Sequence, residues 1–86
     1  MKIYWDGKSK NIIGEKIRAL RNRKGWTQAH LAELLQLEGF EFSDLTVLRI
    51  EGGKRFVADY ELKVLAKVLE VSYEELLDNF DEKDTV

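Results

Sequence analysis

The sequence predicts an all-α fold of five helices. Apolar residues recur at helical spacing, capping residues stand at the starts of segments, and six glycines with no proline divide the chain into helix-length pieces. Residues 1–5 alternate like a short strand, but no partner strand is evident. The 86 residues suffice for one domain. We expect that domain to span residues 11–80, between an N-terminal arm (1–10) and a short tail (81–86).

The first two helices are expected within residues 11–25 and 27–36, because each segment carries a helical apolar stripe. Gly25 follows a basic last turn, as a helix C-terminal stop does. Thr27 is a candidate N-cap. The stripe residues are Ile13, Ile17 and Leu20 in the first segment, and Leu31, Leu34 and Leu35 in the second.

The other three helices are expected within residues 43–53, 58–70 and 72–80. Ser43 is a candidate N-cap for the first of these and precedes a segment that ends at a glycine pair. Ser72, with a glutamate three residues later, forms the S-x-x-E pattern of a capping box. The apolar faces consist of Leu62, Leu65, Ala66 and Leu69 in the fourth segment, and of Leu76, Leu77 and Phe80 in the fifth.

No residue pattern typical of an enzyme is present. Cysteine is absent, and the single histidine, His30, is expected on the surface just after a helix cap. No phosphate-binding loop, zinc motif or nucleophile motif occurs, so we expect no cofactor, no metal and no small-molecule ligand. The chain has neither an 18-residue apolar run nor a secretory apolar region, so a cytoplasmic location without membrane attachment is expected.

The charges are distributed unevenly along the chain. Residues 1–30 carry eight Lys and Arg against two acids, whereas residues 59–86 carry three against nine. A basic end can form an anion-facing surface, and an acidic end avoids phosphates. The same distribution also fits an ordinary solvated surface, and charge alone does not decide between these two interpretations.

Two adjacent helices with a short connection form either a bundle hairpin or a helix-turn-helix. A helical wheel of residues 43–53 gives the second helix an inner and an outer side. Arg49 falls on the outer side, where it is either a contact to DNA or a solvated charge. The inner side holds Val47, Ile50 and Glu51, and the outer side holds Leu45, Arg49 and Gly52, with Leu48 beside them.

Two charged residues fall at the inner edges of their helices. Arg21 lies four residues after Ile17 in the first stripe, and Glu51 lies four after Val47. An unpaired charge in such a position destabilises the fold strongly. We therefore predict that Arg21 and Glu51 pair with each other.

Three stretches together resemble the Cro and phage-repressor type (XRE family) of helix-turn-helix protein. They are "IGEKIRALRNRKGWTQAHLAELL", "TVLRIEGGKR" and "ELKVLAKVLEVSYEELL", and their order and spacing span residues 13–77, about three quarters of the chain. The resemblance implies a five-helix, lambda-repressor-like domain. It also implies that the third helix, about residues 44–52, enters the major groove of DNA.

The resemblance also implies roles for individual residues. One of these is the ion pair, which agrees with the pairing predicted from the inner edges of the two helices. The implied base-facing residues are Asp44, Leu45 and Arg49, the implied phosphate contacts are Thr27, Gln28, Lys54 and Arg55, and the implied ion pair is Arg21 with Glu51.

The connection between the second and third helices departs from the family's usual three or four residues. Here residues 37–43 intervene, although longer variants of this turn also occur in the family. We predict that Leu37, Phe40 and Phe42 form an apolar plug that holds the third helix, and that Gly39 allows the reversal. The rival interpretation is a short β-ribbon.

The sequence thus favours a sequence-specific DNA-binding regulator, acting as a repressor and as a homodimer on double-stranded DNA. The alternative is a protein-interaction module of the same fold, because Leu45 and Leu48 are apolar and Asp44 repels phosphates. The residues available for a dimer interface also suit simple closure of the core. They are Ile3, Tyr4, Trp5, Leu76, Leu77 and Phe80.

Overall fold

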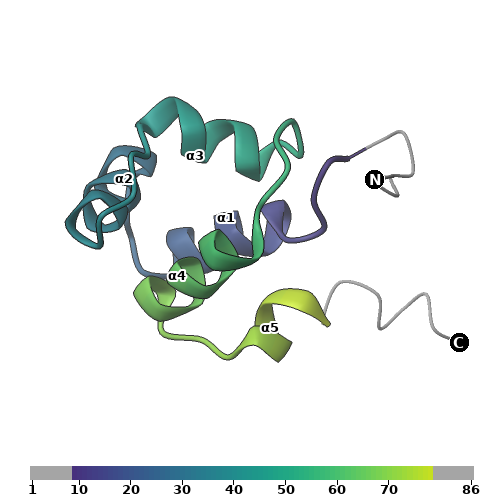
Figure 1. The fold of residues 1–86 in the computed structure, drawn as a ribbon. Helices are drawn as coiled ribbons and strands as arrows, with labels where there is room; N and C mark the ends of the chain where they lie inside the picture. Colours follow the sequence, from purple (N-terminus) through teal and green to yellow (C-terminus); the bar gives the residue numbers. More distant parts are fainter. Residues whose placement is uncertain (1–8, 79–86) are drawn as a thin grey trace, which may run out of the picture.

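The computed structural model describes residues 9–78, and this part of the chain forms five α-helices without a strand (Figure 1). The predicted all-α, five-helix fold is therefore confirmed for the described residues. The strand-like residues 1–5 and the tail 81–86 lie outside them. The helices are α1 (Gly14–Arg23), α2 (Gln28–Leu37), α3 (Asp44–Glu51), α4 (Asp59–Leu69) and α5 (Tyr73–Leu77).

Three of the helices begin at the residues that the sequence marked as caps. The hydroxyl groups of Thr27, Ser43 and Ser72 each accept a hydrogen bond from the backbone N–H three residues later. Each bond satisfies an N–H that has no partner inside its helix. After α1, Gly25 has a φ of 73°, in the left-handed region that glycine adopts without steric penalty. The starts of α2, α3 and α5 are thus determined locally.

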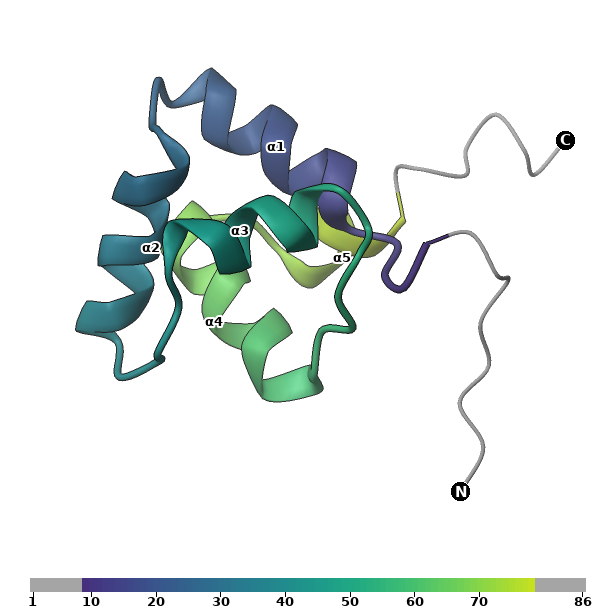
Figure 2. The ribbon, with the colours of Figure 1, turned by 90° about the horizontal axis from the view of Figure 1, so that it is seen from above.

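The hydrophobic core lies beneath α3. Helix α3 crosses one side of the molecule, α2 stands against its N-terminal end, and α1 and α4 lie below it (Figures 1 and 2). Helix α5 packs on α4 at the opposite side (Figure 1). This arrangement leaves one side of α3 without any covering helix. The fully buried core residues include Ile17, Leu31, Leu35, Ile50, Leu65, Leu69 and Leu76.

The connection between α2 and α3 contains the predicted apolar plug, but one of the three residues expected in it lies outside. Phe42 is buried, with 3% of its surface exposed, and its ring meets that of Phe40 edge-on at 6.0 Å. Leu37 was expected in the plug and is not part of it: it is the last residue of α2 and is 81% exposed. Gly39, with a φ of 96°, makes the reversal as predicted. No β-ribbon forms here.

Backbone and side-chain hydrogen bonds close this loop onto α2. The N–H of Phe40 donates to the Leu35 carbonyl at 3.1 Å, and the Gln36 side-chain amide donates to the Phe42 carbonyl at 2.6 Å. Leu37 is excluded from the plug because the helix continues through it and directs its side chain outward. The plug therefore consists of the two phenylalanines, held by α2.

The residues suggested for a dimer interface are only partly described. Leu76 is fully buried and Leu77 packs against the core, so both contribute to closing the core. Phe80 and residues 3–5 lie outside the described residues. Between residues 9 and 78, no helix is long and apolar enough to cross a lipid bilayer.

We predict that replacing Phe42 with alanine destabilises the fold by about 3–5 kcal/mol, because the truncation leaves a cavity beneath the start of α3. Leu37→Ala is the matched control, since Leu37 is 81% exposed and fills no cavity. Chemical denaturation monitored by circular dichroism measures both. Equal stability of the two variants would show that the loop does not support α3.

Candidate nucleic-acid interface

Helix α3 presents a stripe of side chains that the core does not use. Leu45 and Leu48 are 46% and 47% exposed, and Arg49 is exposed beside them. On the opposite side Val47 and Ile50 are buried. This division matches the helical wheel drawn from the sequence. Seen from above, the outer side of α3 faces the viewer, and no other helix crosses it (Figure 2).

A buried ion pair fixes α3 to α1. Nε of Arg21 lies 2.6 Å from one carboxylate oxygen of Glu51, and Nη2 lies 3.1 Å from the other. The side chain of Glu51 is fully buried, and that of Arg21 is 11% exposed. Arg21 also donates to the carbonyl of Trp26 at 2.6 Å, which ties in the turn between α1 and α2. The ion pair predicted from the sequence is present.

The environment of Glu51 sets its charge state. Burial raises the pKa of its carboxyl group, because desolvation penalises the negative charge. Hydrogen bonds from Arg21 and Gln28, together with the positive charge of Arg21, outweigh burial and hold the pKa of Glu51 below its ordinary value. The carboxylate therefore stays ionised inside the protein at neutral pH.

Two residues at the start of α2 were expected at phosphates. The Gln28 amide donates to Glu51 at 3.0 Å, so it completes the buried cluster rather than pointing away from the protein. The Thr27 hydroxyl accepts from the N–H of His30 at 3.0 Å, and its own proton remains available for an outside acceptor. His30 is 45% exposed, as expected, and its ring stands edge-on to that of Trp26.

The C-terminal end of α3 is braced by a residue that the sequence analysis did not single out. The Asn11 amide nitrogen donates to the carbonyls of Ile50 and Arg55 at 3.1 and 2.8 Å. Its oxygen accepts from the N–H groups of Ile13 and Gly14, which are at the start of α1. Asn11 therefore joins two helix ends. An asparagine directly before an apolar stripe is itself a capping signal, and this was the clue available in the sequence.

Gly14 permits this close approach of α1 to α3. A Cβ atom at Gly14 would lie 2.8 Å from the carbonyl oxygen of Glu51, and closer still to that of Ile50. Both obstacles are backbone atoms, which cannot rotate away as a flexible side chain does. A side chain at this position would therefore push the end of α3 out of place, although nothing local in the sequence indicates this.

Arg55, expected at phosphate, is one-third exposed and forms an ion pair within the protein. Its guanidinium group forms two hydrogen bonds to the carboxylate of Glu61, at 2.9 and 3.0 Å. It also lies over the Phe42 ring, 5.2 Å from the centroid. Arg55 thus links the turn after α3 to α4 and to the plug, and its contact to phosphate stays a prediction.

Lys54 and Asp44 lie at the two ends of the outer side of α3. Lys54 follows the C-terminus of the helix and is exposed, and its N–H donates to the Arg49 carbonyl at 2.8 Å. Asp44 is the first residue of the helix, and its carboxylate accepts from the N–H of Leu45 at 2.8 Å. A carboxylate in this place is stabilised by the helix N-terminus.

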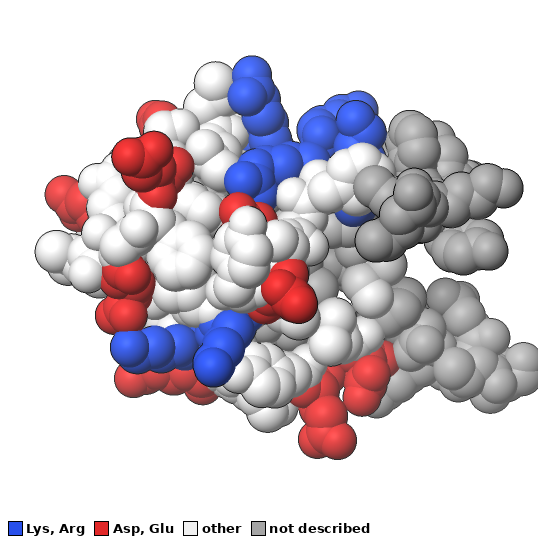
Figure 3. Space-filling model, viewed as in Figure 1, with Lys and Arg blue, Asp and Glu red and all other residues white. Residues whose placement is uncertain are grey.

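Basic side chains form two groups on the face shown in Figure 3, and one of them lies on the side of α3. Figure 3 shows one group of Lys and Arg atoms at the top of the molecule, on the side of α3, and a second group at the lower left beside acidic atoms. Further acidic atoms lie at the upper left, near the centre and along the lower edge. Arg18 on α1 is half exposed, and its Nε lies 3.5 Å from Glu51 at the margin of the buried cluster. The outer side of α3 is thus apolar at its centre, with cations toward its C-terminal end.

A family described as a helix-turn-helix domain matches residues 12–80. The chain belongs to this helix-turn-helix family. Among solved structures it is similar to the crystal structure of the DNA-binding domain of BldD, with a TM-score of 0.68 and 28% sequence identity. That similarity covers 86% of this chain and 99% of the other. A comparison with curated proteins found no match.

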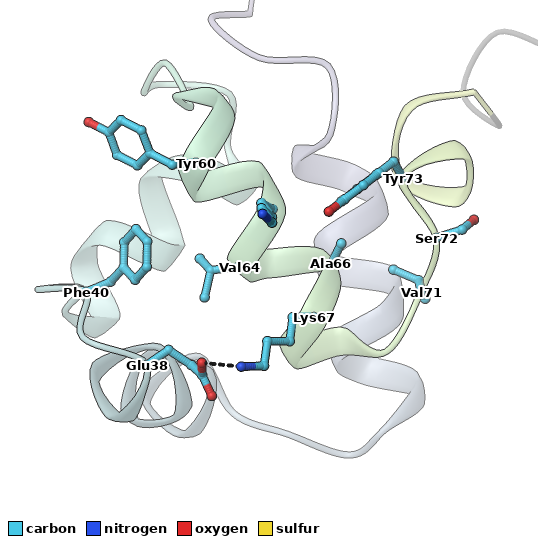
Figure 4. A pocket seen from close by; sticks show the side chains of 10 residues that line it. Glu38, Phe40, Tyr60, Val64, Ala66, Lys67, Val71, Ser72 and Tyr73 are labelled. Carbon is cyan, nitrogen blue, oxygen red and sulfur yellow. Dashed lines mark hydrogen bonds and ion pairs between the residues drawn. The ribbon is translucent and has the colours of Figure 1, made fainter.

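The helix-turn-helix domain also has a groove on another side, which no motif in the sequence predicts. The groove has a volume of about 620 Å³ and lies between the α2–α3 loop, α4 and the start of α5 (Figure 4). Phe40, Tyr60 and Tyr73 line it, and an exposed ion pair between Lys67 and Glu38 lies at its edge. Within residues 9–78, no three acidic or histidine side chains are grouped as a metal site would require.

We predict that Arg21→Ala destabilises this helix-turn-helix domain by about 3–5 kcal/mol, because Glu51 then remains buried without its partner. Lys24→Ala is the matched control. Lys24 pairs at 3.3 Å with Glu70, which is 78% exposed, and an exposed pair contributes about 0–1 kcal/mol. Urea denaturation at neutral pH compares the variants. Equal effects would contradict a structural role for the buried pair.

The low pKa of Glu51 predicts a loss of stability in acid. Its folded-state pKa lies below the unfolded value of about 4.3, so the unfolded chain binds more protons and stability falls as the pH drops through this range. Glu51→Gln has no charge to titrate. We therefore expect the free energy of unfolding of Glu51→Gln to depend less on pH than that of the parent below about pH 4.3. The two slopes should differ by at most about 1.4 kcal/mol per pH unit, the limit for one proton.

The comparison requires denaturation curves of parent and Glu51→Gln between neutral pH and pH 3. Glu61 keeps part of the acid sensitivity in both proteins, because the Arg55 hydrogen bond lowers its pKa against the opposing effect of burial. Parallel curves for the two proteins would mean that Glu51 titrates normally and that the cluster does not depend on its charge.

Proposed function

We propose that this helix-turn-helix protein is a sequence-specific DNA-binding transcriptional regulator that represses by occupying its site. The single observation that carries the proposal is the outer side of α3. It holds Leu45, Leu48 and Arg49, none of which the core uses, on a helix fixed at both ends. A helix of this diameter fits the major groove of B-form DNA. The similarity to the DNA-binding domain of BldD supports the same function.

In this proposal Arg49 and its neighbours face base edges. Arginine donates two hydrogen bonds to guanine, and the carboxylate of Asp44 accepts one from the amino group of cytosine. Lys54, the Thr27 hydroxyl and the first N–H groups of α2 contact phosphates on either side. The Gln28 amide donates one N–H to Glu51 and keeps a second N–H for a phosphate, so in this proposal it both positions α3 and joins these contacts. The cation-rich end of α3 gives the complex its salt dependence.

A second candidate function is a protein-interaction module of the same fold. It is favoured by one observation, the two half-exposed leucines at the centre of the outer side of α3. Their apolar surface suits a protein partner as well as a base edge. The two functions differ in whether the parent protein binds duplex DNA in a manner that weakens with salt.

We predict that Lys54→Ala and Arg49→Ala weaken DNA binding in different ways. Lys54→Ala should weaken binding to all duplexes about equally and reduce the slope of log affinity against log salt by about one, because one phosphate contact is lost. Arg49→Ala should cost about 1–3 kcal/mol on a selected site and little on a scrambled one, because a guanine contact is lost. Titrations of both duplexes across a salt series measure this.

Lys63→Ala on α4 provides the control, since Lys63 is exposed but lies at the groove and away from α3. It should leave both affinities at the parent level. Equal losses on both duplexes would reassign Arg49 to a phosphate. If the parent binds no duplex even at low salt, the protein-interaction function replaces this one.

The same titration reports the stoichiometry of binding. We propose that two protomers bind one two-fold site, with their α3 helices about 34 Å apart, one turn of the duplex. Sedimentation of the protein with the selected duplex should therefore give two protomers per site. One protomer per site at saturation would exclude this arrangement.

A further inference from the structure

We propose that Leu45 and Leu48 read the methyl groups of thymine, and that the bound sequence therefore carries thymines where α3 lies in the major groove. The inference rests on the proposed function and specifies its target. It concerns the two leucines that interrupt the otherwise polar outer side of α3.

The two leucines have no packing role within residues 9–78 that accounts for them. They are 46% and 47% exposed, whereas Val47 and Ile50 on the same helix are 1% exposed. A half-exposed leucine leaves apolar surface in water, which becomes favourable only when a partner covers it. Because α3 is held firmly, a partner that binds this side gains most by presenting its own apolar group where each leucine points.

Base edges in the major groove offer such a group at one base. Guanine, adenine and cytosine present hydrogen-bond donors and acceptors there, whereas thymine also presents its C5-methyl group. Leucine has no donor or acceptor and gains nothing from the polar edges. The two leucines therefore discriminate for thymine, and Arg49 beside them supplies a polar contact to guanine.

The spacing of the leucines restricts the arrangement of the thymines. Residues three apart on a helix have Cβ atoms about 5–6 Å apart. Successive base pairs rise about 3.4 Å along the duplex axis. The two side chains thus reach bases separated by one or two steps, on one strand or across both. A selected half-site should contain two thymines at this separation, next to a guanine under Arg49.

The position of α3 in the charge pattern favours DNA over a protein as the partner of this stripe. Arg49 lies within the stripe and Lys54 follows it, so cations that suit guanine and phosphate stand on the C-terminal side of the leucines, whereas the carboxylate of Asp44 on the N-terminal side suits the amino group of cytosine. The rings of Phe40, Tyr60 and Tyr73 line the groove on another side of the molecule, where an apolar partner can bind without covering α3 (Figure 4).

Replacing thymine with uracil tests the inference, because uracil lacks only the methyl group. The selected duplex is compared with duplexes in which single thymines are changed to deoxyuridine, and binding is titrated with the parent and with Leu45→Ala and Leu48→Ala. For the parent, the critical substitutions should weaken binding about four-fold each, the factor expected for one methyl group that is no longer buried. For each leucine variant, one of these thymine-to-deoxyuridine changes should no longer weaken binding.

Leu37→Ala is the matched control, because Leu37 is an exposed leucine at the far end of α2 and outside the stripe. It should keep the full sensitivity to uracil. All three variants should unfold at the parent temperature, since none of these side chains is buried. Thermal unfolding checks this before the titrations.

Two results would overturn the inference while leaving DNA binding intact. One is a selected site without thymines under α3. The other is parent-level uracil sensitivity in both Leu45→Ala and Leu48→Ala. A parent that binds no duplex at low salt overturns the proposed function as well, and the leucines then belong to a protein-binding surface. The failure of the inference and the failure of DNA binding are therefore distinguishable.

Discussion

The carboxylate of Glu51 is the interaction on which the rest of this structure depends. It is fully buried, and hydrogen bonds from Arg21 on α1 and Gln28 on α2 compensate its desolvation. One charge on α3 thereby fixes the relative positions of three helices. A purely apolar contact would tolerate small rotations of α3, whereas these hydrogen bonds lose strength when distances or angles change.

Helix α3 has eight residues, and a helix this short is not stable in water by itself. Each end of α3 is therefore held by its own set of interactions. The Ser43 capping box and the buried Phe42 hold its start. The Asn11 amide and the close approach of Gly14 hold its end. With the Glu51 cluster beneath it, the helix is held at both ends and on its inner side, as the proposed contact with a fixed spacing of base pairs requires.

The outer side of α3 combines an apolar centre with cations at one end, and the groove between the α2–α3 loop, α4 and α5 lies elsewhere. These surfaces therefore suit different partners. Charges also act in two ways in this protein. Arg21 and Arg55 are bound to buried or half-buried carboxylates and stabilise the fold, whereas Arg49 and Lys54 remain exposed. In the composition of the chain these four residues count alike as positive charges, and only the groups around each one in the fold show which role it has.

The sequence by itself determined the helices, their caps and the two sides of α3, because hydrophobic spacing and capping are local properties that short segments carry. It also indicated the ion pair, since charges at the inner edges of two helices need partners. Tertiary structure alone decided that Leu37 stays outside the plug, that Arg55 binds Glu61, and that Gly14 must lack a side chain. These features depend on which distant segments meet, and that information is not contained in local spacing.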